Sequence, residues 1–179
     1  MINKALRPAA AVVVAAAMLA GTASGVAARS VERPFVIHQV GYTTEIVYAP
    51  SFPDGDTFGG RCSRPSQWVS SSAGTGHDTH LGRVTWASQH CFQLFSGTFS
   101  DARVVITAAN GDQIHATYEG VMTGETTFTD SLVITGGTGR FAGATGSVDE
   151  TGWFDPATGY MEVGGVGTIS YDASERGSG

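Results

Sequence analysis

Few ionisable residues of this 179-residue chain are placed where they could do chemistry. His115 and Glu119 share one face of the strand predicted over 113–121, and Glu150 lies on the strand predicted over 145–154. A carboxyl group buried among apolar side chains has a raised pKa and can act as an acid or a base. Burial statistics favour a solvated carboxylate at each position, because charged side chains are seldom fully buried. We therefore treat these three residues as candidate ligand-binding residues and leave the catalytic residues unassigned.

Two aromatic residues complete the candidate site. Trp86 and Tyr118 are better suited to a ligand wall than to catalysis, since large aromatic rings supply much of the buried area of a small domain. Ordinary core packing is the leading explanation for both. The face that carries Tyr118 also carries Ile114 and Ala116, and it is more apolar than the face of His115 and Glu119. That contrast favours a solvent-facing His115 and Glu119, although alternation alone does not decide which face is inside.

Other kinds of chemistry lack their sequence signals. The five histidines do not have metal-ligand spacing, there is no Cys-x-x-Cys, and there is no Gly-x-Ser-x-Gly. We predict neither a metal nor a cofactor. Cys62 and Cys91 are the only cysteines, and in an exported protein such a pair forms a disulfide more often than a redox or metal site.

The first 28 residues predict export. Lys4 and Arg7 precede an apolar stretch over 9–20, and Ala28 ends a small-residue cleavage site, which is the pattern of a secretory signal peptide. The remaining chain has no long apolar run, so we predict a secreted protein without a membrane span. It also has no lysine, and its formal charge becomes −8 because Lys4 and Arg7 leave a chain whose charge is −6. An acidic, lysine-free surface argues against binding nucleic acid.

The rest of the chain predicts an all-β fold. Asn110-Gly111 is a strong hairpin signal between two alternating runs, and nothing after residue 34 has the spacing of an amphipathic helix. We predict a single antiparallel β-barrel of seven to eight strands within 29–171, with a sandwich as the alternative. Residues 34–48 form one bulged strand or two short ones, 49–79 a long loop rich in Pro, Gly and Ser, and 172–179 a flexible tail. The other strands are predicted over 80–92, 102–108, 113–121, 126–135, 145–154 and 160–171.

A glycine-rich corner links two of these strands. Gly136, Gly137 and Gly139 follow a β-branched run, and Phe141 is the one large apolar side chain among small residues. No Lys-Ser/Thr follows, so the motif does not bind nucleotides. We predict a structural role, with at least one of these glycines at positive φ and Phe141 buried as a plug.

The corner resembles the signature of plant dirigent proteins and of secreted bacterial proteins with an allene-oxide-cyclase-like barrel. The matching residues are Gly136, Gly137, Thr138, Gly139, Phe141, Ala144 and Gly146. The resemblance implies an eight-stranded antiparallel barrel with an apolar central cavity, and trimers as in plant members. Dirigent proteins steer the coupling of phenoxy radicals, and allene oxide cyclases cyclise a fatty-acid epoxide. The chain departs from the dirigent signature at Thr145, where that family has Arg, so dirigent chemistry is not transferred.

Three classes of function remain. We favour a barrel that binds a small apolar molecule in its cavity, without convincing catalytic machinery. The alternative is a cyclase or isomerase, or dirigent-type guidance of a reactive intermediate, in which the pocket shape and one or two polar groups direct the reaction. The third is a structural secreted protein that acts through its surface or oligomer contacts. A filled barrel would exclude both ligand hypotheses, and a cavity with paired buried ionisable groups would favour the enzyme.

Overall fold

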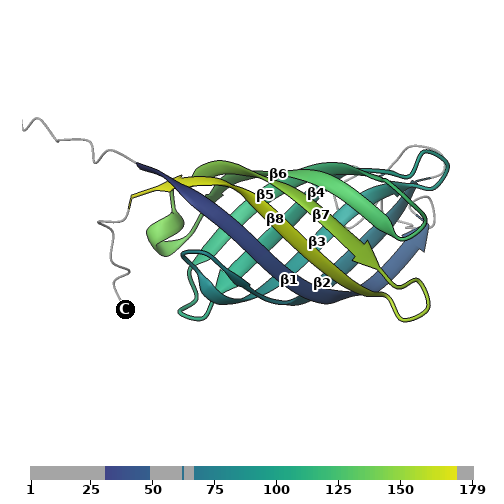
Figure 1. Ribbon diagram of the computed structural model, residues 1–179, viewed down its shortest axis with the longest axis horizontal. Coiled ribbons are helices and arrows are strands. Elements are labelled where there is room, and N and C mark those ends of the chain that lie inside the picture. The colour runs from purple at the N-terminus through teal and green to yellow at the C-terminus, as the bar shows by residue number, and fades with distance from the viewer. Residues whose placement is uncertain (1–30, 49–61, 63–66, 173–179) are drawn as a thin grey trace, which may run out of the picture.

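The computed structural model describes residues 31–48, 62 and 67–172. Eight antiparallel strands follow one another in chain order and close into a barrel, because β1 pairs with both β2 and β8 (Figure 1). The predicted all-β antiparallel barrel is confirmed. The strands are β1 (Val31–Tyr48), β2 (Gln67–Asp78), β3 (Gly82–Gln93), β4 (Thr98–Ala108), β5 (Gln113–Met122), β6 (Thr127–Gly137), β7 (Thr145–Phe154) and β8 (Tyr160–Tyr171).

Alternation along each strand separates the inside of the barrel from the outside. In β4, Ala102, Val104 and Ile106 are buried, whereas Arg103 and Val105 between them are exposed. Successive side chains of a strand point to opposite faces, so one apolar row per strand fills the interior. A register shift between Thr43 and Glu45 marks the bulge of the long first strand. Of the two alternatives for this region, the structure has the single bulged strand.

One end of the barrel is packed solid. Its core includes Phe35, Ile37, Ile114 and Ile169, none of which has any exposed surface. The short 3-10 helix η2 (Gly139–Phe141) lies at this end, beside the start of β1 and the end of β8 (Figure 1). Phe141 is fully buried, and its ring meets that of Tyr171 edge to face with 4.9 Å between ring centroids. We call this the plugged end of the barrel.

The glycine corner is structural, as predicted. Gly136 and Gly139 have φ angles of 147° and 54°, which favour glycine. At Gly137 the reason is space, because a Cβ atom there would collide with the backbone oxygen of Gln113. The backbone of β5 thus passes directly against the corner, and Phe141 follows at the depth required to fill the end of the barrel.

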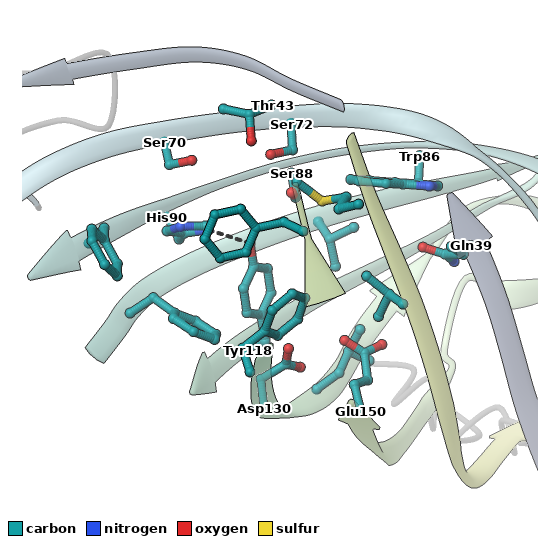
Figure 2. Close-up of a pocket in the computed structure, with 18 of the residues that line it drawn as sticks. Gln39, Thr43, Ser70, Ser72, Trp86, Ser88, His90, Tyr118, Asp130 and Glu150 are labelled. Carbon is teal, nitrogen blue, oxygen red and sulfur yellow. Dashed lines mark hydrogen bonds between the residues drawn. The ribbon is translucent and has the colours of Figure 1, made fainter. Parts of the chain in front are cut away.

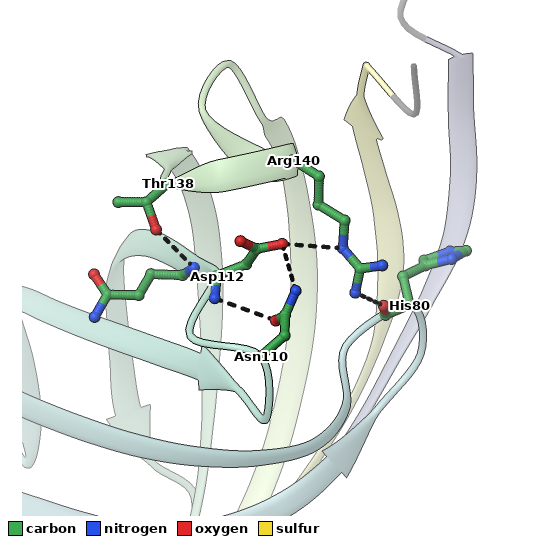
Figure 3. Close-up of polar contacts among 6 residues, drawn as sticks. His80, Asn110, Asp112, Thr138 and Arg140 are labelled. Carbon is green, nitrogen blue, oxygen red and sulfur yellow. Dashed lines mark hydrogen bonds and ion pairs between the residues drawn. The ribbon is translucent and has the colours of Figure 1, made fainter. Parts of the chain in front are cut away.

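Polar contacts tie the corner to two neighbouring turns (Figure 3). Arg140 forms an ion pair with Asp112, with 3.6 Å from Nε to Oδ2, and it donates a hydrogen bond of 2.5 Å to the backbone oxygen of His80. The backbone N–H of Gln113 donates to Thr138 Oγ1 at 3.0 Å. These contacts join the corner to the β4–β5 hairpin and to the β2–β3 turn.

The prediction of a loop throughout 49–79 is wrong for its last part, because Gln67–Asp78 forms β2. The inward positions of β2 hold Ser70, Ser72 and Gly74, so the strand lacks the apolar alternation that identifies a strand in a sequence. Gly74 pairs with Trp86 on β3, and a Cβ atom at Gly41 of β1 would collide with the indole. A Cβ atom at Gly74 would collide with the backbone of Val40, so glycine is needed at Gly41 by the indole and at Gly74 by the close approach of β1.

Several predicted segments lie outside the described residues. They are the signal peptide over 1–28, most of the tail over 172–179, and the parts 49–61 and 63–66 of the predicted loop. The described part of the chain contains no helix long and apolar enough to cross a membrane.

The predicted disulfide is confirmed, since Cys62 and Cys91 are bonded. Both cysteines are buried with Val69 in a small separate cluster. Val69 lies between Ser70 and Trp68 on β2, on the face opposite to the barrel interior. The disulfide therefore fastens a segment of the 49–66 region to the outer wall of the barrel.

Candidate functional site

The half of the barrel away from the plugged end encloses a cavity of about 180 Å³ (Figure 2). All eight strands contribute to its wall, which is mainly apolar. Its aromatic side chains are Trp86, Phe92, Phe99, Tyr118, Phe128 and Phe154. Its polar side chains are Gln39, Thr43, Ser70, Ser72, Ser88, His90, Asp130 and Glu150. A mostly apolar concavity with a few convergent polar groups is the usual form of a small-molecule site.

Two carboxyl groups form the most unusual feature of the cavity. Asp130 of β6 and Glu150 of β7 are directly opposite each other in the strand register and are 8% and 7% exposed. Burial raises the pKa of both groups, and the nearby Asp130 charge raises the pKa of Glu150 further. The hydrogen bond between them raises the pKa of Glu150 and lowers that of Asp130. Glu150 is therefore the protonated partner, and it donates the hydrogen bond that Asp130 accepts.

A third buried acid supports the polar part of the wall. Asp78 at the end of β2 has no exposed surface; its Oδ2 accepts a 2.7 Å hydrogen bond from Gln39 Nε2, and its Oδ1 one of 3.3 Å from the backbone N–H of His38. Burial raises the pKa of Asp78 to about 6. Gln39 lines the cavity and is thus oriented from behind by Asp78, whose charge also raises the pKa of Glu150.

His90 and Tyr118 form a neutral pair in the cavity wall. His90 Nδ1 and the Tyr118 hydroxyl are 2.8 Å apart (Figure 2). Burial lowers the pKa of His90 to about 4 and raises that of Tyr118 well above its usual value. The Phe99 ring packs against both, with centroid distances of 5.3 Å to His90 and 6.1 Å to Tyr118. At neutral pH neither residue brings charge into the cavity.

Two buried polar atoms of the cavity wall lack a hydrogen-bond partner among the described residues. They are the indole Nε1 of Trp86 and the Oδ1 atom of Asp130. A buried polar atom without a partner costs free energy that a ligand, a water molecule or a shared proton can recover. The cavity thus presents one free donor and one free acceptor.

The structure brings three of the five candidate residues to the cavity, namely Trp86, Tyr118 and Glu150. His115 and Glu119 are on the outer face of β5 and do not line it. His115 Nε2 is 3.1 Å from Gln113 Oε1, and Glu119 is exposed. The physical reason is that the apolar row of Ile114, Ala116 and Tyr118 takes the interior, which leaves the other row to solvent.

Asp130 was missed from the sequence, although a signal for it exists. It shares its strand face with Phe128, Leu132 and Ile134, so an acid interrupts an otherwise apolar row. Glu150 similarly follows Val148 on the inner face of β7. An acid in the middle of such a row is a better indicator of a functional carboxyl than an acid on a polar face.

The arrangement has two chemical capabilities. It can hold a small apolar body against aromatic rings and hydrogen-bond its polar end, and the Glu150–Asp130 pair can move a proton. No cluster of three or more His, Cys, Asp or Glu residues suited to a metal ion occurs among the described residues. Comparisons of the chain with protein-family models, with curated proteins and with solved structures found no match.

Proposed function

We propose that this barrel binds one small, mostly apolar molecule of about the size of a single substituted ring. The supporting observation is the cavity of about 180 Å³ with its aromatic wall. An engineered apolar cavity of about 150 Å³ is enough to bind benzene. The polar side chains of the cavity wall would orient a ligand that the apolar wall holds.

The proposal extends to export and to family. The disulfide fits an oxidising compartment, and the signal-peptide pattern over 1–28 predicts the same destination. Membership of the dirigent and allene-oxide-cyclase-like barrels is likewise proposed. Its supports are the eight-stranded antiparallel barrel and the glycine motif, which forms the corner at the plugged end. Thr145 still departs from the dirigent pattern.

The test uses ethylbenzene and 2-phenylethanol as probes, with binding followed by changes in protein NMR spectra. We expect saturable binding of at least one probe to the unmodified chain. Ser88→Phe places a ring inside the cavity and should abolish binding, whereas Ser131→Phe makes the same change on the exposed face of β6 and should not. Circular dichroism confirms that both variants are folded. No binding by the unmodified chain, or equal binding by both variants, would contradict the proposal.

A second candidate is an isomerase that works by proton transfer. It is favoured by the hydrogen-bonded pair of Glu150 and Asp130 inside an apolar cavity, where a carboxyl group can act as acid or base. The probe is phenylacetone in D₂O, with NMR detection of deuterium incorporated beside its carbonyl group. We expect exchange above the protein-free rate that Glu150→Gln abolishes and the exposed Glu119→Gln retains. Exchange at the protein-free rate would leave only the binding function.

A further inference from the structure

The cavity is acidic at one side and lacks a positive side chain to balance it. Asp130 and Glu150 both line it, and the described lining residues include no Lys or Arg. His90 is held neutral by burial. The hydrogen bond between the two carboxyl groups lowers the pKa of Asp130 and raises that of Glu150, so Asp130 is the member of the pair that carries negative charge into a largely apolar enclosure. A buried charge without an opposite charge is costly, and this cost favours a ligand that brings a positive charge.

The walls around this acid pair suit a cation. The lining is rich in aromatic rings, and aromatic rings attract ammonium groups placed over their faces. Phe99 contacts both Tyr118 and Phe128 edge to face, with ring centroids 6.1 Å and 5.9 Å apart, so the rings form a continuous wall. Asp130 and Glu150 both raise the pKa of the Tyr118 hydroxyl, which places this wall next to the acid pair.

An unpartnered acceptor supplies the second, independent observation. Oδ1 of Asp130 is buried on a side chain only 8% exposed, and no donor of the described protein reaches it. Figure 2 shows the Asp130 and Glu150 side chains near one another at the bottom of the view, and Gln39 and Trp86 lie above them on the side of Glu150. An N–H group of an ammonium ion would satisfy Oδ1 with a charge-assisted hydrogen bond.

We propose that the cavity selects a protonated primary amine that carries one aromatic ring, with the ammonium group on the Asp130–Glu150 pair and the ring against the aromatic wall. This inference rests on the proposed binding function and names its ligand class. The ammonium neutralises the single charge of the pair, so no proton needs to be taken up or released. A carboxylate ligand is excluded by repulsion from the same pair.

The first experiment compares three probes of similar shape by isothermal titration calorimetry at pH 7 on the full chain. They are 2-phenylethylamine, the neutral 2-phenylethanol and the anionic 3-phenylpropanoate. We expect the amine to bind about ten- to hundredfold more tightly than the alcohol, as for one hydrogen bond to a charged group. The anion should not bind. An alcohol that binds as tightly as the amine would overturn the inference and leave the binding function intact, whereas binding by no probe would remove both.

The second experiment tests the acid pair itself. Asp130→Asn keeps the shape of the side chain and removes the negative charge of the pair, because Glu150 is the protonated partner. We expect it to weaken 2-phenylethylamine binding about ten- to hundredfold and to leave 2-phenylethanol binding within about twofold. Glu150→Gln replaces the protonated carboxyl by a neutral amide, leaves the charge on Asp130, and should retain the preference for the amine over the alcohol. Glu119→Gln, on the outer face of β5, is the further control and should change neither affinity. An unchanged amine affinity in a folded Asp130→Asn would overturn the inference, and the three-probe comparison decides the case without any variant.

Discussion

The two ends of the barrel are built from the same strands but do opposite things with their interiors. In β6, Ile134 is packed into the core toward the plugged end, Phe128 and Asp130 line the cavity, and Leu132 between them belongs to both. The plugged end excludes space with large apolar side chains and the buried ring of Phe141. The cavity end keeps space open and introduces acids. One end of a closed barrel can therefore supply the close packing that stabilises the fold, while the other end keeps a cavity in which a ligand can bind.

The polar groups at the two ends differ in the same way. At the plugged end, Arg140 and Thr138 connect the corner to neighbouring turns through contacts that hold the backbone (Figure 3). At the cavity end, Asp130 Oδ1 and Trp86 Nε1 are buried without a partner among the described residues. Contacts that connect turns stabilise a fold, whereas buried polar atoms without a partner are typical of a site in which a ligand supplies the missing partner.

The largest expected effect tests the plugged end. Phe141→Ala should lower the free energy of unfolding by about 3–5 kcal/mol, because it leaves a cavity in close-packed surroundings. Phe128→Ala removes a similar ring from the cavity wall, where the ring already borders empty space, and should cost clearly less. Urea denaturation followed by circular dichroism measures both. Equal losses would show that the two ends do not differ in how tightly they are packed.

A smaller effect is expected at the glycine corner. Gly137→Ala should cost about 1–3 kcal/mol, because the new Cβ atom collides with the backbone of Gln113 and forces the corner to move. Gly143→Ala is the matched control: a Cβ atom there meets nothing within 4 Å, so the unfolding free energy should change by less than about 0.5 kcal/mol. Thermal melts of the two variants decide the matter. A corner that tolerates both changes would not be the structural element described here.

The smallest effect concerns the pH dependence of stability at the cavity end. Burial raises the pKa of Glu150, so the folded protein binds this proton more tightly than the unfolded chain does. Its stabilisation is complete below the ordinary carboxyl pKa of 4.5 and is lost as the pH rises through the raised pKa. Relative to Glu150→Gln, the unmodified protein should lose on the order of 1 kcal/mol between pH 5 and pH 8.

The comparison between variants isolates Glu150, because Asp78 is present in both and contributes a slope of the same sign. Urea denaturation at a series of pH values gives the two stability curves. Glu119→Gln serves as the control and should run parallel to the unmodified protein, since Glu119 is exposed on the outer face. Parallel curves for Glu150→Gln would mean that Glu150 is not held protonated in the folded barrel.

Local chemistry explains which features could be predicted. The disulfide follows from two cysteines together with the predicted signal peptide, and the corner follows from glycines whose requirements are set by their own backbone angles and their nearest neighbour. β2 was assigned to a loop because Ser70, Ser72 and Gly74 look like turn residues in a sequence. For Gly74 the cause is the close approach of β1, because a Cβ atom there would collide with the backbone of Val40, which is a contact between segments. The strand propensities of single residue types do not reflect such a contact between strands.

By itself, the sequence determined the all-β class, the closed antiparallel sheet, the disulfide and the structural nature of the glycine corner. These depend on alternation, turn residues and covalent partners, which are properties of short segments. Only the tertiary structure decided that Trp86, Tyr118 and Glu150 face a cavity while His115 and Glu119 face outward. It also brought Asp130 opposite Glu150, because that meeting depends on the register between β6 and β7. A shift of one residue would have turned one of the two acids to the solvent.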